Sequence, residues 1–151
     1  MQTTYVNSTY YQINLTARYL KIFAAQIFSD LGASISFEEY IVLDILKNLG
    51  SMCQRDLAKL ILKDRANTGR ICNSLCEKKY IEVKFEEKNN RPVKKCYLTR
   101  NGKKCFDKIW SKVRPLLNEI MQYFDEEEEK RLQNSLIKCR EKIKQLVEIQ
   151  I

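Results

Sequence analysis

Residues 53–98 read CQRDLAKLILKDRANTGRICNSLCEKKYIEVKFEEKNNRPVKKCYL. The apolar spacing predicts a short helix from Cys53 to Ile61 and, after a turn, a second helix from about Asp64 to Lys78. Strict alternation from Ile81 to Glu86 predicts a half-buried strand, and Val93 to Leu98 is expected to return beside it. This order of helix, turn, helix and ribbon predicts a winged helix-turn-helix in a mainly α-helical chain with a small β-wing.

The second helix of this segment is predicted to have an apolar inner stripe and a polar outer face. Arginine can pair with guanine, asparagine can pair with adenine, and a small alanine allows close approach to a groove. The residues that we expect to read bases are Arg65, Ala66, Asn67, Arg70, Asn73 and Ser74. An ordinary amphipathic surface helix would show the same pattern, so this helix alone does not establish a DNA-binding function.

The ribbon is predicted to turn over five residues, Lys88 to Pro92. Asparagine tolerates left-handed backbone angles and proline interrupts a ladder, which favours a turn here. Lys88 and Arg91 at such a tip can reach a minor groove or the phosphates beside it. Candidate contacts to the DNA backbone are Gln54, Arg55, Lys59, Lys94 and Lys95.

The run from Leu57 to Lys104 resembles the DNA-binding lobe of the MarR family of bacterial transcriptional regulators. The features that match in order and spacing are Leu57-Ala58, Asp64-Arg65, Arg70, Leu75, Lys78, Tyr80-Ile81, Arg91, Leu98-Thr99 and Gly102. The resemblance implies a sequence-specific regulator of double-stranded DNA, most often a repressor, that binds a pseudo-palindromic operator as a homodimer. It also implies that Arg91 anchors the wing and that the terminal helices form the dimer interface.

Three positions depart from the family pattern. Leu62 and Lys79 stand where the family often has glycine, so both turns must close with a side chain present. Asn89 stands where the family usually has an aspartate two residues before the wing arginine. An ion pair that would orient Arg91 is therefore replaced at best by a neutral hydrogen bond.

The net charge of +8 is concentrated in the winged segment. Residues 51–104 contain fifteen Lys or Arg against six Asp or Glu, while the rest of the chain has twelve against thirteen. Such local basicity indicates a polyanionic partner. A membrane surface is the competing polyanion, but the segment lacks the exposed apolar face of an interfacial helix. A partner-docking module that never reads bases remains an alternative.

The 151 residues are enough for one domain. We expect a DNA-binding lobe at about 35–104 and dimerisation helices at about 5–32 and 105–151. Charged residues interrupt every apolar run well short of about 18 residues, and the first residues lack a basic start and an apolar block. We therefore expect a cytoplasmic protein without a membrane span.

Six cysteines and no histidine are present. Without histidine the common zinc patterns and the usual base for a Ser or Cys nucleophile are missing, and no phosphate-binding glycine motif occurs. We expect no enzymatic activity, no metal and no cofactor. The cysteines are interpreted as small buried apolar residues. The alternative is a redox-responsive regulator, with Cys105 the candidate because a helix start and Lys103 and Lys104 would favour its thiolate.

Apolar stripes are also predicted at both ends of the chain. Val6 to Leu31 follow a four-three spacing over more than three heptads, which calls for a partner along the whole helix. Thr99 and Asp125 are expected to cap two further apolar-striped helices, the first of them interrupted by Pro115. A second copy of the chain is the predicted partner.

A scaffold helix is predicted to begin at the capping box Ser36-Phe37-Glu38-Glu39. Its expected inward residues are Phe37, Tyr40, Ile41, Ile45 and Leu49. Regulators of the resembling family often respond to small aromatic molecules in a cleft between lobes. Tyr19, Phe23, Phe37 and Tyr40 could line such a cleft, although aromatic residues at helical spacing are more often core. The effector is not identified by the sequence.

Overall fold

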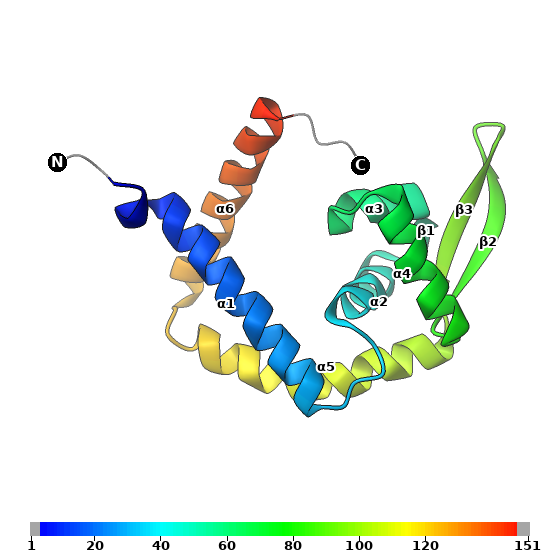
Figure 1. The fold of residues 1–151 in the computed structure, drawn as a ribbon, viewed down its shortest axis with the longest axis horizontal. Helices are drawn as coiled ribbons and strands as arrows, with labels where there is room; N and C mark the ends of the chain where they lie inside the picture. Colours follow the sequence, from blue (N-terminus) through cyan, green and yellow to red (C-terminus); the bar gives the residue numbers. More distant parts are fainter. Residues whose placement is uncertain (1–3, 148–151) are drawn as a thin grey trace.

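The structure, a computed structural model, describes residues 4–147 and is built mainly of helices with one small sheet (Figure 1). In chain order the elements are η1 (Tyr5–Asn7), α1 (Thr9–Asp30), α2 (Phe37–Leu49), β1 (Met52–Cys53), α3 (Gln54–Ile61), α4 (Arg65–Glu77), β2 (Ile81–Lys88), β3 (Arg91–Leu98), α5 (Arg100–Met121) and α6 (Glu126–Leu146). The winged lobe lies at the N-terminal end of α5, and α6 leaves from the other end. This is the predicted winged helix-turn-helix flanked by long terminal helices.

The predicted helix starts are confirmed by their capping hydrogen bonds. Ser36 and Glu39 form a reciprocal capping box on α2, and Asp64 and Thr99 accept from the backbone amides of Asn67 and Gly102. Asp125 forms a second capping box with Glu128 on α6. Each of these side chains satisfies amides that the helix itself leaves free.

The first helix begins later than its apolar spacing predicted. Ser8 caps α1 and accepts from the amide of Tyr11, so Val6 lies in the separate turn η1. Within the described part of α1 the buried residues are Ala24, Ile27 and Phe28, close to its C-terminal end. The longer N-terminal part of its stripe is exposed in the single chain.

The buried face of α2 also differs from the prediction. Phe37 and Leu49 were expected to face inward but are 42% and 65% exposed. The buried residues are Glu39, Tyr40, Val42, Leu43 and Leu46. The reason is tertiary: α2 contacts α1, α3, α4, α5 and β3, so its covered surface is wider than one helical stripe.

The core of the winged lobe extends into the first half of α5. Phe106, Ile109 and Val113 are buried with the core residues of α2, α3 and α4. The ring of Tyr40 stacks on Phe106 with centroids 5.0 Å apart. A side chain at Gly102 would clash with the backbone carbonyl of Tyr80, so only glycine allows α5 to start this close to the end of α4.

The wing is a three-stranded antiparallel sheet in the order β1-β3-β2. The predicted five-residue tip is wrong: Asn89 and Asn90, with φ of 52° and 57°, form a two-residue turn, and Lys88 pairs directly with Arg91. Left-handed angles at both positions are typical of a type I′ hairpin turn. Pro92 is tolerated in β3 because β1 pairs only with residues 95 and 96, which leaves that edge of β3 open at Pro92.

Both turns around α4 close in the left-handed region, as the missing glycines required. Leu62 has φ of 52° and Lys79 has φ of 60°. Left-handed angles are unfavourable for residues with a side chain. The turn before α4 and the turn after it therefore both carry backbone strain.

No helix in residues 4–147 has both the length and the apolar composition needed to cross a membrane.

Candidate nucleic-acid interface

The helix α4 presents a polar face to solvent because its opposite face is packed into the lobe. Thr68, Cys72 and Leu75 are buried, as predicted. The expected base-reading residues Arg65, Ala66, Arg70 and Asn73 are exposed, whereas Asn67 is half-buried and its side-chain amide donates to Asp64. The exposed face begins at the first turn of the helix, where free amides also favour an anion.

Ser74 does not belong to this exposed face. The prediction that it points outward is wrong, because its hydroxyl donates to Glu39 of α2 with 2.6 Å between Oγ and Oε1. A buried carboxylate requires hydrogen-bond donors, and Ser74 is one turn of α4 from Lys78, which supplies another. Ser74 therefore faces the scaffold.

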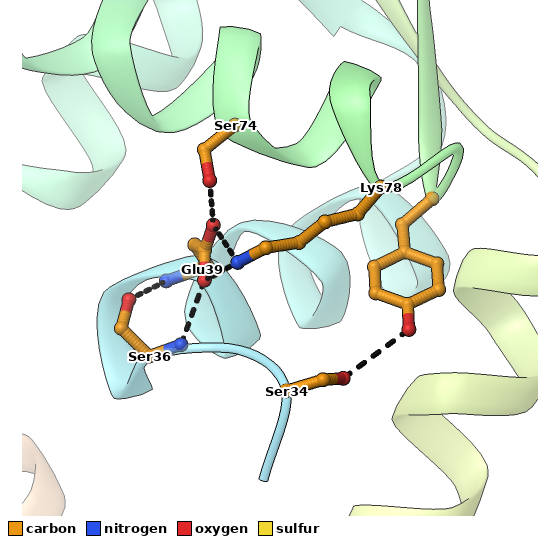
Figure 2. Close-up of polar contacts among 6 residues, drawn as sticks. Ser34, Ser36, Glu39, Ser74 and Lys78 are labelled. Atoms are coloured by element: carbon orange, nitrogen blue, oxygen red, sulfur yellow. Dashed lines mark hydrogen bonds and ion pairs between the residues drawn. The ribbon is translucent and has the colours of Figure 1, made fainter.

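Glu39 is the centre of a polar cluster between α2 and α4 (Figure 2). Its Oε1 and Oε2 are each 2.8 Å from Nζ of Lys78, and Oε2 also accepts from the backbone amide of Ser36 at 2.7 Å. Burial raises the pKa of Glu39, but the hydrogen bonds from Lys78, Ser74 and Ser36 outweigh it and hold the pKa below its usual 4.5. The carboxylate is therefore charged at neutral pH. The capping box could be predicted from the sequence, but this link to α4 could not.

The exposed cations of α3 lie near those of α4 and the wing. Arg55 and Lys59 are exposed, while Gln54 is half-buried and its side chain lies beside the thiol of Cys72. A hollow of about 360 Å³ is lined by Arg55 of α3, Arg65 of α4, and Arg91 and Lys94 of β3. A second hollow of about 560 Å³ is lined by Arg55, Lys59, Lys88 and Arg91, and by Asp56, whose carboxylate lies 3.8 Å from Nζ of Lys88. We refer to these two as the basic hollows.

The two neighbouring lysines of β3, Lys94 and Lys95, lie on opposite faces of the sheet. Successive strand residues point to opposite sides of a sheet, so Lys94 and Lys95 diverge. Lys94 lines the first basic hollow beside Arg65. Lys95 lies on the other side, where its Nζ is 3.2 Å from the carboxylate of Glu86 and its side chain is only 29% exposed. The expectation that both lysines contact one DNA backbone is therefore not supported by their placement.

The cysteines are mostly part of the core. Cys72 and Cys96 are fully buried with their Sγ atoms 3.8 Å apart, between α4 and β3. The expectation that Cys105 has a thiolate-favouring environment is wrong: burial raises its pKa, and hydrogen bonding from Tyr80 and Ser34 opposes this only in part. Within residues 4–147, no group of three or more Cys, Asp or Glu is arranged to hold a metal ion.

A separate apolar cleft of about 890 Å³ lies between α1, α2, α3 and α4. Leu20, Phe28, Phe37, Ile41, Ile61 and Ile71 line it. Of the four aromatic residues that could have lined a cleft, only Phe37 does so. Tyr40 packs in the core between Phe28 and Phe106 instead.

The sequence matches no known protein-family model and no curated protein. Solved structures match it closely in fold. A MarR/EmrR family transcriptional regulator from Acinetobacter sp. ADP1 is 24% identical, with a TM-score of 0.76 over 89% of this chain and 93% of that one. The MepR–DNA complex of S. aureus is 19% identical, with a TM-score of 0.75 over 93% and 99%.

A third similar structure is the BpsR protein of Bordetella bronchiseptica, whose DNA binding is regulated by 6-hydroxynicotinic acid. It is 18% identical, with a TM-score of 0.67 over 85% of this chain and 98% of that one. The chain therefore has the fold of MarR family transcriptional regulators, and the alignments span nearly the whole length of both partners.

Proposed function

We propose that the chain is a sequence-specific DNA-binding transcriptional regulator that acts as a homodimer and represses transcription. The observation that carries the proposal is the shared position of an exposed reading face on α4 and two basic hollows. Arg70 and Asn73 can form hydrogen bonds with bases. The cations of α3 and β3 that line the hollows can bind phosphates beside those bases. The DNA complex of the structurally similar MepR supports this assignment.

The dimer is proposed from the uncovered apolar faces of the terminal helices. No residue of α6 is buried, although Leu132, Ile137, Ile143 and Leu146 are large and apolar. A second copy would cover these faces and would place two reading helices about a two-fold axis. The operator is then a pseudo-palindrome whose half-sites lie about one helical turn, roughly 10 base pairs, apart.

Selection of bound duplexes from a random pool tests this proposal. We expect enrichment of a pseudo-palindromic motif with the spacing given above. A matched control is the variant Arg65→Glu/Arg91→Glu, which reverses two charges in the first basic hollow and should bind no duplex tightly. Binding that is weak and independent of sequence in the unmodified protein would instead support a module that docks an acidic partner.

We also propose that a small, mainly apolar effector binds in the apolar cleft. Its size and apolar lining suit such a molecule, and a small aromatic acid regulates the structurally similar BpsR. The variant Ile41→Trp would fill part of the cleft. It should abolish any effect of a candidate aromatic acid on operator affinity while operator binding without the compound is retained.

A further inference from the structure

The two ends of α4 are held in different ways. At its N-terminal end, Asp64 accepts from Asn67 and Thr68 donates to the Asp64 carbonyl, so these bonds lie within the helix and its cap. At its C-terminal half, Ser74 and Lys78 are bonded to Glu39, which belongs to α2. The polar contacts described above therefore tie α4 to the scaffold through one carboxylate at its C-terminal half.

The chain just after α4 is fixed to the same region. The Tyr80 hydroxyl lies 3.2 Å from the hydroxyl of Ser34, just before α2. Thr99 Oγ1 donates to the carbonyls of Lys79 and Tyr80 at 2.8 and 3.0 Å. The C-terminal end of α4 is thus surrounded by hydrogen bonds, and Glu39 accepts those of Ser74 and Lys78.

In this ion pair the Glu39 carboxylate is buried, while the Lys78 side chain is 33% exposed. Removing the carboxylate from water offsets part of the attraction, so the pair is a weak stabiliser. Its hydrogen bonds, however, constrain both distance and angle. The apolar contacts of the buried Leu75 and Cys72 are not directional, whereas the bonds to Glu39 are.

We propose that Glu39 is a positioning residue for base readout: by holding Ser74 and Lys78, it sets the orientation in which α4 presents Arg70 and Asn73 to the groove. Asn73 precedes Ser74 directly, and Arg70 lies one helical turn before it. A displacement at Ser74 is therefore passed to both side chains. This inference rests on the proposed DNA-binding function, and it assigns no contact between Glu39 and DNA.

The proposal predicts a selective defect. Base readout depends on bonds that tolerate only small errors in distance and angle, whereas phosphate contacts come from the cations of the basic hollows and are less demanding. Loosening α4 should weaken binding to the operator but leave binding to an unrelated duplex nearly unchanged. If Glu39 contributed only to stability, the folded variant would keep its affinity both for the operator and for an unrelated duplex.

The test is the double variant Ser74→Ala/Lys78→Met in the full-length protein. It removes both α4 partners of Glu39 and leaves the capping bonds between Ser36 and Glu39 in place. Operator affinity should fall about tenfold or more, while affinity for an unrelated duplex and the salt dependence of binding change by less than about twofold. Ser74→Ala alone, which keeps the ion pair, should give a smaller loss of the same kind.

A matched control is Asp107→Asn, because Lys47 and Asp107 also form an ion pair between α2 and another helix, at 2.5 Å. That pair lies outside α4, and its carboxylate is half exposed, so operator affinity should be retained. All affinities are measured well below the melting temperature of each variant, and circular dichroism confirms folding.

Three results would overturn the inference, and they are distinguishable. Unchanged operator affinity in the folded double variant and in Ser74→Ala would show that Glu39 is only a structural residue. An equal loss on operator and unrelated duplex, with a reduced salt dependence, would make Lys78 a phosphate contact. If the unmodified protein selects no duplex, the proposed function itself fails and the positioning role fails with it.

Discussion

The winged lobe and the terminal helices are built from similar apolar patterns but complete their packing differently. In the lobe, Val42, Leu43, Leu57 and Leu75 are fully buried within one chain. In α6 no residue is buried, and in α1 the buried residues gather near the C-terminal end. An apolar stripe therefore predicts that a face will be covered, but it does not say by what.

The difference follows from how far each helix lies from the rest of the chain. The helices α2, α3 and α4 of the lobe are short, and α3, α4 and the first half of α5 pack around α2. The 22-residue α1 and the 21-residue α6 each span about 30 Å and extend beyond the lobe. We expect the lobe to be stabilised by its own chain and the terminal helices by association.

The largest effect is expected from a cavity in the lobe. Leu43→Ala removes a fully buried side chain and should lower the free energy of unfolding by about 2–5 kcal/mol. Chemical denaturation measures this loss. Leu49→Ala on the same helix is the control, because Leu49 is mostly exposed and its truncation should cost well under about 1 kcal/mol. Equal losses would mean that the lobe core is wrongly assigned.

Association should be the weak point of the terminal helices. Ile143→Asp places a charge on the exposed apolar face of α6 and should weaken the proposed dimer by about 100-fold or more, since a buried unpaired charge is costly. Sedimentation at several concentrations would detect the shift towards monomer. Gln145→Asp adds the same charge at an exposed polar position and should leave the dimer intact. A folded monomer for the unmodified protein would remove the proposed dimer.

Within the lobe, readout and anchoring can be separated at Arg70 and Arg91. Arg70→Ala should cost about 1–3 kcal/mol of discrimination at particular base positions if the side chain pairs with guanine. Arg91→Ala should weaken all duplexes more evenly and reduce the salt dependence, because Asn89 is engaged in the turn and offers no charge to orient the wing. Binding assays on the operator and its single-base variants distinguish the two patterns. Even weakening by Arg70→Ala would make it a phosphate contact.

A smaller effect is expected from acid. Because the pKa of Glu39 is lowered in the folded state, its contribution to stability is complete above its unfolded value of about 4.5 and is lost as the pH falls through the lowered pKa. Glu39→Gln, which cannot titrate, should show a smaller loss of stability between pH 6 and pH 3. Parallel urea denaturation of both proteins measures this difference. Identical pH profiles would contradict the lowered pKa.

The smallest effect concerns strain at the turn that leaves α4. Lys79→Gly relieves the backbone strain of a left-handed residue, which should stabilise the folded state. Glycine also makes the unfolded chain more flexible, which offsets part of this gain, so the free energy of unfolding should rise by up to about 1 kcal/mol. Thermal melting is sensitive enough to follow it. Glu77→Gly, at the last residue of the helix, is the matched control and should lower stability by up to about 1 kcal/mol. A loss at position 79 would show that the Lys79 side chain makes a contact of its own.

Local sequence was sufficient for the helices, their caps and the basic character of the lobe. Capping boxes, apolar periodicity and strand alternation involve residues within four positions of one another, and such patterns can be seen without the fold. Ser36 with Glu39 and Asp64 with Asn67 belong to this group. The exposed Arg70 and Asn73 were predicted in the same way. The left-handed turns at Leu62 and Lys79 were not, because they were expected only from the glycines that the resembling family often has there.

The tertiary structure decided which of these local faces are used. It turned Ser74 towards a carboxylate 35 residues away, placed Nζ of Lys95 3.2 Å from the carboxylate of Glu86, and buried Cys105 enough to raise its pKa. It also widened the covered face of α2 by surrounding that helix with five other elements. A helical wheel describes the faces of a single helix. These outcomes depend on where a second element packs against that helix, and the packing of the whole lobe sets that position.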